Sequence, residues 1–186
     1  GPTVTDASNR KTALDMISLY GITLPDRVMS FLETAPEDAP TEQLGEVNVI
    51  ASASISLEAA ASLARDHGVS PAILSDAIEG EARDIGMMHA AIACEVAQRA
   101  RPFAPPVVIL SGGETTVTLR GDGGRGGRNV EFALALAVAL EEALGMAPGG
   151  IHAIAGDTDG VDGAEEVAGA VIGPDTLTRA RAAGID

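Results

Sequence analysis

The chain has 186 residues, of which 46% are hydrophobic and 2% aromatic, and its formal net charge is −15 at pH 7. This length can bury the core of one full-sized domain, and an acidic balance excludes nucleic acid as a partner, because a phosphate backbone is bound by a basic face. The single cysteine, Cys94, cannot form a disulfide within the chain. The sequence has neither an apolar run of membrane length nor a signal-peptide pattern, so we expect a cytoplasmic protein with no membrane partner.

The N-terminal part predicts one helix followed by a linker. Asp6 is suited to cap a helix that runs to Tyr20 and stops at Gly21. The following residues carry several prolines among acidic and small residues, as is typical of a crossing segment. We therefore expect residues 1–45 to be the tail of a preceding N-terminal domain with a crossing segment, and 46–186 to be a C-terminal α/β domain. The chain looks cut at both ends.

From residue 47 onward, predicted strands and helices alternate. Apolar periodicity indicates strands at 47–53, 72–75, 107–111 and 151–156, and helices at Ser56–His67, Glu79–Ala100, 130–145 and from Pro174. Residues 115–120 alternate apolar and polar side chains, which predicts an edge or antiparallel strand. The expected fold class is α/β, with a mainly parallel sheet, helices on both of its faces and one such extra strand.

The loop "RGDGGRGGRN" (120–129) contains the spacing Gly121-x-Gly123-x-x-Gly126. A dinucleotide-binding turn with this spacing follows a buried strand and precedes an acidic residue about 20 positions on. Here the preceding strand is half polar, and the next acidic residue beyond a second strand is Asp157, so only the helix after the loop fits a nicotinamide site.

Arginines give the same loop a second interpretation. Arg120, Arg125 and Arg128 lie beside a predicted helix N-terminus, whose N–H groups and dipole favour an anion. The alternative is a solvated turn whose arginines offset an acidic surface. Small residues and carboxylates are expected at the carboxyl ends of successive strands, in the segments 75–76, 111–114 and 156–160. Open α/β sheets bind their ligands at these ends. Together with the arginines, these residues favour a site that binds an anion and a metal ion.

Two segments resemble a known family. "SGGETTVTLRGDGGRGGRNVEFALALA" and "AGDTDGVDGAEEVAGAVI" are similar to the C-terminal signature, called MOFRL, of the glycerate 2-kinases or class II glycerate kinases, from about residue 107. Upstream, "SDAIEGEARDIG", "NVIASASISLEAA" and "GPTV" also resemble this family, so the resemblance covers most of the chain. Many of its members carry the label hydroxypyruvate reductase.

The resemblance implies a two-domain α/β enzyme with its active site in the cleft between the domains. Such an enzyme transfers the γ-phosphoryl group of ATP to the 2-hydroxyl of D-glycerate with Mg²⁺, giving 2-phosphoglycerate. This chain would form one wall of that site, and the missing N-terminal domain would supply a catalytic lysine. The chain alone is then expected to be inactive, and a homodimer is left open.

The resemblance also assigns candidate site residues. Arg128 would stabilise phosphoryl charge or clamp the glycerate carboxylate. Asp157 and Asp159 would ligate Mg²⁺ or orient the attacking hydroxyl, and which of them faces the site is left open. Glu114 would bind metal or pin an arginine. The predicted substrate-binding and phosphate-binding residues are Ser111, Gly112, Gly113, Glu114, Arg120, Gly126, Gly127 and Asn129.

Other reactive residue types are better explained by structure. Cys94 lies on an Ala-rich helix and is expected in the core. His67, His89 and His152 are too scattered for a metal site. Two competing functions stay open: an NAD(P)H-dependent hydroxypyruvate reductase and a non-catalytic ligand-binding domain.

Overall fold

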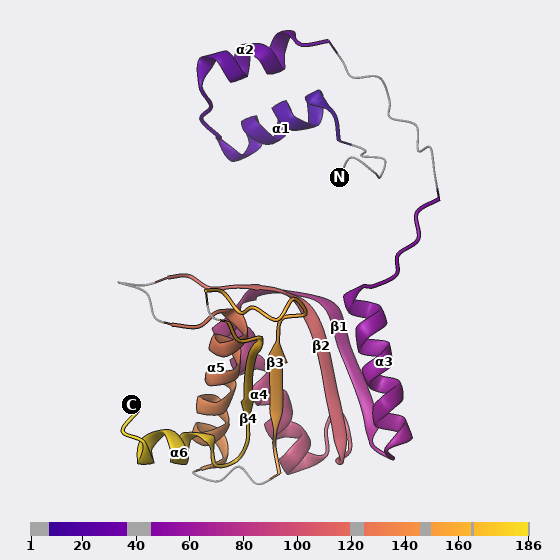
Figure 1. Ribbon diagram of the computed structural model, residues 1–186, viewed down its shortest axis with the longest axis vertical. Helices are drawn as coiled ribbons and strands as arrows, with labels where there is room; N and C mark the ends of the chain where they lie inside the picture. The colour runs from indigo at the N-terminus through magenta and orange to yellow at the C-terminus, as the bar shows by residue number, and fades with distance from the viewer. Residues whose placement is uncertain (1–7, 37–45, 120–124, 146–149, 165, 186) are drawn as a thin grey trace. The chain divides into compact units, whose positions relative to one another are not determined.

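The computed structural model describes residues 8–36, 46–119, 125–145, 150–164 and 166–185 (Figure 1). The chain divides into two compact units, Gly1–Ile50 and Ala51–Asp186. Within the described ranges, no helix combines the length and the apolar character needed to cross a membrane.

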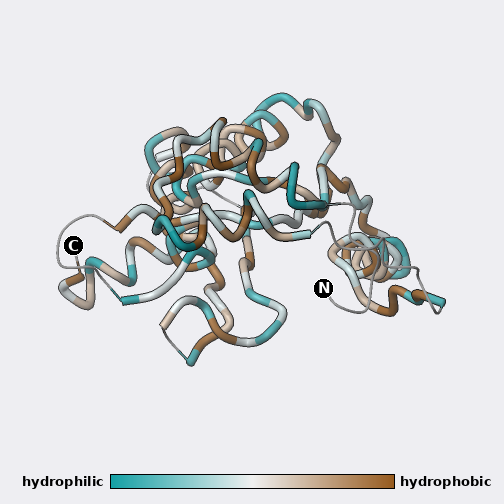
Figure 2. Tube along the Cα trace, turned by 90° about the horizontal axis from the view of Figure 1, so that it is seen from above, coloured by the Kyte–Doolittle hydropathy of each residue, from teal (hydrophilic) through white to brown (hydrophobic). Residues whose placement is uncertain are grey.

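The first unit contains two short helices, α1 (Arg10–Tyr20) and α2 (Asp26–Thr34). Asn9 caps α1 by accepting a hydrogen bond from a backbone N–H of the first turn, so the expected cap at Asp6, outside the described residues, is wrong. Gly21 ends α1 with a φ of 59°, which confirms the predicted stop. Neither helix has a buried residue, although hydrophobic stretches, brown in Figure 2, recur in this unit.

The second unit begins with α3 (Ala53–Asp66). The strand expected at 47–53 is therefore wrong, and the helix starts three residues before the expected Ser56. The local reason is Ser52, whose side chain caps α3 by accepting a hydrogen bond from the backbone N–H of Ile55 at 3.2 Å. An apolar run without a pairing strand does not form a sheet, and Ile50 is accordingly 91% exposed.

β1 (Ser70–Glu81) and β2 (Val107–Thr116) form a parallel two-stranded sheet. Both strands are longer than predicted, because their pairing continues to Glu81 and Thr116, with register shifts on either side of the pair Ser75↔Ser111. A separate edge or antiparallel strand, expected at 115–120, does not form: residues 115 and 116 end the parallel β2, residues 117–119 are not in a strand, and Arg120 lies outside the described residues. The following helix, α4 (Ala82–Arg99), starts after β1 rather than near Glu79.

Helices cover both faces of the β1–β2 sheet. Neighbouring residues of a strand point to opposite faces. The Ser111 hydroxyl of β2 bonds to His89 of α4, whereas Gly112 lies against Ala53 and Leu57 of α3. Figure 1 shows the same arrangement, with the two strands between α3 and α4. The predicted covering of both faces is confirmed for this sheet.

The C-terminal part of the second unit contains α5 (Arg128–Leu144), β3 (Ala153–Gly156), β4 (Gly169–Ile172) and the short α6 (Thr176–Ala182). β3 and β4 pair antiparallel and form a separate two-stranded sheet against α5. The α/β class is thus confirmed, but its antiparallel component lies here. The predicted end of α5 at Gly145 is also confirmed.

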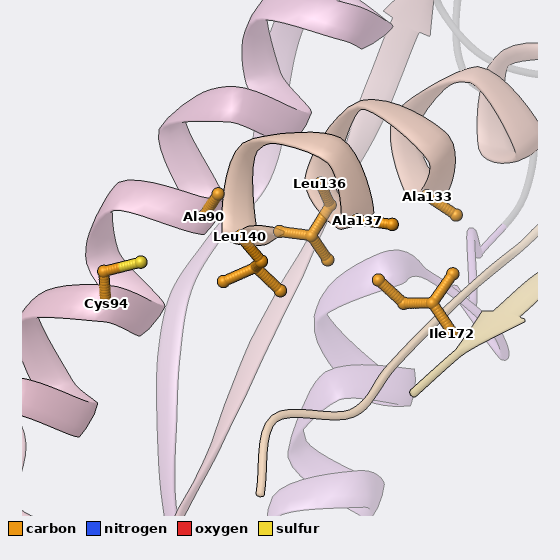
Figure 3. Packing of buried hydrophobic residues seen from close by; sticks show 7 residues of the cluster. All are labelled: Ala90, Cys94, Ala133, Leu136, Ala137, Leu140 and Ile172. Atoms are coloured by element: carbon orange, nitrogen blue, oxygen red, sulfur yellow. The ribbon is translucent and has the colours of Figure 1, made fainter. Parts of the chain in front are cut away.

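The core lies between α4, α5 and β4, and small side chains bring the two helices close together (Figure 3). A Cβ atom on Gly86 of α4 would stand 2.5 Å from the carbonyl oxygen of Phe132 of α5, so this crossing has no room for a side chain. Burial raises the pKa of the Cys94 thiol, which fits its predicted place in the core. The buried cluster consists of Ala90, Cys94, Ala133, Leu136, Ala137, Leu140 and Ile172.

Candidate functional site

Arg128, the first residue of α5, binds two carboxylates that come from different elements. Its Nη2 and Nε atoms donate to Oδ2 of Asp157, in the loop after β3, at 2.6 and 3.2 Å. Its Nη1 atom donates to Oε1 of Glu114 in β2. The structure thus gathers three of the predicted site residues, which we call the Arg128 cluster, and Glu114 pins an arginine, one of its two predicted roles.

The charges of the Arg128 cluster reinforce one another. The hydrogen bond from Arg128 lowers the pKa of Asp157 and outweighs the opposing effect of burial. The same bond raises the pKa of Arg128, which therefore keeps its proton. Asp157 is a carboxylate at neutral pH and a poor acceptor for a further proton.

A buried aspartate holds the start of α5 in place. The side chain of Asp162 has an exposed fraction of 0% and accepts hydrogen bonds from the backbone N–H of Asn129 at 3.0 Å, from its amide Nδ2 at 3.1 Å and from the N–H of Val130 at 2.8 Å. Gly127 provides no cap of its own, and a Cβ there would stand 2.5 Å from Oδ1 of Asp162. The helix amides that the sequence offered to an external anion thus bind the chain's own carboxylate.

The Gly-rich loop is described only from Arg125 onward. Arg120, Gly121 and Gly123 lie outside the described residues, so the dinucleotide spacing is not placed as a whole. Gly126 has a φ of +106°, a conformation that residues with a side chain rarely adopt, and it lies against Val130.

Ser111, Gly112 and Gly113 lie within β2 rather than beyond its carboxyl end, which corrects the expectation from the predicted strand 107–111. Asp76, expected after the first parallel strand, likewise lies inside β1. Gly113 has a φ of +151°, and a Cβ on it would collide with the backbone of Ile78 in β1. Gly113 therefore lets the backbones of β1 and β2 approach one another closely.

Asp159 lies in the exposed part of the loop after β3. Its Oδ1 accepts the backbone N–H of Val161 at 2.8 Å, a turn within the loop itself. Across the ranges that the structure describes, no group of three or more His, Cys, Asp or Glu side chains is placed to hold a metal ion. The predicted Mg²⁺ ligands Asp157 and Asp159 therefore stay a prediction.

One contact that the sequence did not indicate involves His89. Its Nε2 atom lies 2.9 Å from Oγ of Ser111, and its Nδ1 atom lies 2.8 Å from the carbonyl oxygen of Ile85. The ring also meets Phe132 edge to face, with centroids 5.1 Å apart. Only Ile85, four residues before His89 on the same helix, is close enough in sequence to have suggested a partner.

Comparison with known proteins shows which family the residues of this site are similar to. The model of the MOFRL family matches residues 107–186, which include the whole Arg128 cluster. These residues are thus similar to the MOFRL family. We refer to residues 107–186 below as the MOFRL segment.

Relatives extend the similarity to the whole chain. A protein from Agrobacterium vitis named "Putative hydroxypyruvate reductase" is 50% identical over 188 residues, covering 100% of this chain and 42% of that protein. A glycerate 2-kinase from Pyrococcus horikoshii is 39% identical over 194 residues, covering 100% of this chain and 43% of that protein. The expected resemblance to the glycerate 2-kinases is confirmed, and this chain spans less than half the length of these relatives.

A solved structure agrees with the fold. The crystal structure of a glycerate kinase from Thermotoga maritima matches with a TM-score of 0.78 and 32% sequence identity. The match covers 97% of this chain and 42% of that chain.

Proposed function

We propose that the protein carrying this chain is a glycerate kinase that uses ATP to phosphorylate the 2-hydroxyl of D-glycerate, giving 2-phosphoglycerate. The observation that carries the proposal is the Arg128 cluster, which joins α5, β2 and the loop after β3 inside the MOFRL segment. Relatives named glycerate kinases, which align with the whole chain, support it.

Arg128 is the group that we expect to bind the anionic part of a substrate. Phosphoryl transfer depends mainly on positioning and on neutralising charge, and a guanidinium binds a phosphate or a carboxylate through parallel hydrogen bonds. The guanidinium has five N–H groups, and its bonds to Asp157 and Glu114 use three of them, so two remain for an incoming anion. The Glu114 side chain is 71% exposed and that of Asp157 only 17%, so we expect the anion to approach from the side of Glu114, which keeps its bond to Arg128.

Mg²⁺ is the ion that this reaction requires, and the loop after β3 carries our candidates for its ligands. Mg²⁺ binds one or two carboxylates together with substrate phosphates and waters, so it needs no complete cage in the protein. The carboxylates of Asp157 and Asp159 fit this chemistry. When bound, the ion would neutralise charge on the transferred phosphoryl group.

We further propose that this chain supplies only part of the active site. Residues 1–45 would end the N-terminal domain, and 46–186 would form the C-terminal domain. The first relatives are more than twice as long as the aligned segment, which leaves room for a second wall with the lysine implied by the resemblance. We therefore expect the isolated chain to be inactive, and the full protein to be cytoplasmic.

A hydroxypyruvate reductase is the second candidate. Two relatives from Agrobacterium vitis, 50% and 45% identical, carry that name, and the loop 120–129 has a dinucleotide-like spacing. A protein that only binds a ligand is the third.

One experiment separates the three candidates. The full-length protein is supplied with D-glycerate, ATP and Mg²⁺, and ADP formation is followed together with the phosphorylated product. In parallel, NADH and NADPH oxidation is measured with hydroxypyruvate. We expect phosphorylation and no nicotinamide oxidation. The reverse result would establish the reductase, and binding of glycerate without either reaction would establish the third candidate.

A further inference from the structure

His89 is fixed by three contacts from three parts of the second unit. The carbonyl oxygen of Ile85, one turn earlier on α4, lies 2.8 Å from Nδ1, and the hydroxyl of Ser111 in β2 lies 2.9 Å from Nε2. The ring of Phe132 on α5 packs against it at an interplanar angle of 76°. Phe132 lies one helical turn after Arg128, and Ser111 lies three residues before Glu114. His89 thus connects two of the three elements that carry the Arg128 cluster, β2 and α5.

The Ile85 contact decides which ring nitrogen holds the proton. A carbonyl oxygen can only accept a hydrogen bond, so Nδ1 must carry hydrogen. In the neutral imidazole, Nε2 is then the unprotonated nitrogen and accepts the hydroxyl hydrogen of Ser111. The Ser111 oxygen consequently presents lone pairs, not a proton, to any group that approaches from another side.

Phosphorylation of a hydroxyl needs a group that receives its proton. Asp157 is poorly suited, because its hydrogen bonds with Arg128 lower its pKa. Glu114 is held by the same arginine. The Ser111 oxygen, which has lone pairs available and the Nε2 atom of His89 behind it, is the better acceptor.

We propose that Ser111 and His89 form a proton relay for the attacking hydroxyl, an inference that rests on the kinase function proposed above. The substrate hydroxyl oxygen forms a bond to the γ-phosphorus of ATP while the bond from that phosphorus to the leaving oxygen of ADP breaks. The hydroxyl proton moves to Oγ of Ser111, and the proton of Ser111 moves to Nε2 of His89. The resulting imidazolium donates to Ile85 and Ser111, and returns its extra proton to water after the product leaves.

The relay requires the ring of His89 to take up a proton among uncharged groups. Its three contacts are with uncharged groups, and the residues three and four positions away on α4 are uncharged as well. Ionisable residues also occur on the elements packed against the ring. Counted along the sequence from the residues that contact His89 or pair with Ser111, the nearest are Glu114 of β2, Arg128 and Glu131 of α5, and Asp76 of β1. Ser111 is the group that touches the substrate, and His89 is a positioning residue that acts through it.

The test uses the full-length enzyme and the variants His89→Gln and Ser111→Ala. Gln can still accept the Ser111 hydrogen bond but cannot take up its proton. We expect kcat to fall about 100-fold in each, the magnitude of lost general base catalysis. The dependence of kcat/KM on pH should differ between the wild type and His89→Gln, because only the histidine can take up the proton that Ser111 passes on. His67→Gln, at the end of α3, is the matched control and should keep the wild-type profile, and circular dichroism checks that each variant is folded.

A second measurement does not depend on turnover. Imidazole ¹⁵N shifts of the wild-type protein, assigned by comparison with His89→Gln, should show His89 protonated on Nδ1 alone at neutral pH. Protonation on Nε2 alone would overturn the relay, as would an active His89→Gln enzyme that keeps the wild-type pH profile. A wild-type enzyme that forms no phosphorylated glycerate would instead overturn the proposed function, and this step with it.

Discussion

Replacing Asp162 with alanine tests whether the loop after β3 holds the start of α5. The buried Asp162 carboxylate accepts three hydrogen bonds from Asn129 and Val130. A hydrogen bond to a charged group contributes about 1.5–3 kcal/mol, whereas the loss of a helix cap costs about 0.5–2 kcal/mol. Because the three bonds act on one helix turn and are not additive, we expect the free energy of unfolding to fall by about 3 kcal/mol. The melting temperature should then fall by roughly 6–12 °C.

Urea unfolding followed by circular dichroism measures this loss. Asp159→Ala is the matched control, since this exposed aspartate of the same loop accepts one N–H within its own turn and its removal should cost at most about 0.5 kcal/mol. Asp162→Asn should lie between the two, because an amide oxygen can still accept from one of the helix amides. Equal losses in Asp162→Ala and Asp159→Ala would refute the reasoning, because they would mean that water serves the three donors as well as the carboxylate does.

Three further outcomes are expected. Arg128→Lys should lower the turnover of the full-length enzyme at least about tenfold, because an ammonium group cannot donate in two directions from one plane. Arg179→Lys on α6 is the control and should leave turnover unchanged. If Arg128→Lys turned over as fast as the wild type, Arg128 would not belong to the site. Asp157→Asn should destabilise the protein fully above pH 3.8, the usual aspartate pKa, because the bond to Arg128 lowers the pKa of Asp157. This difference in stability should disappear as the pH falls through that lowered pKa. Acid unfolding of the wild type and of Asp157→Asn measures it. Asp159→Asn should shift the Mg²⁺ dependence of turnover while leaving the melting temperature within about 2 °C of wild type, and a superimposable Mg²⁺ titration would contradict its role in binding the ion.

Local signals in the sequence predicted the parts of the fold that local interactions determine. Gly21 and Gly145 end their helices where expected, because a helix stop depends on the conformation of one residue. The strand expected at 47–53 failed because a strand exists only through its partner, and the same dependence hid the full length of β1. Composition could set the α/β class, but it could not show which strands would pair.

The same division holds for the site. The resemblance to a known family brought Arg128, Asp157 and Glu114 together in advance, and the structure bonds them to one another. Asp162 and His89 were missed because their partners lie 33 and 22 residues away, and nothing at either position in the sequence indicates which backbone or hydroxyl group will approach. Asp162, in the same loop as Asp157 and Asp159, completes the first turn of α5.

That completion has a consequence for the order in which the protein folds. Gly127 gives the first turn of α5 no side-chain cap, so we expect this turn to stay frayed during synthesis until the chain has grown as far as Asp162 and the β3–β4 pair has docked. Hydrogen exchange at the amides of Asn129 and Val130 therefore reports on the docking of that loop rather than on the helix to which they belong.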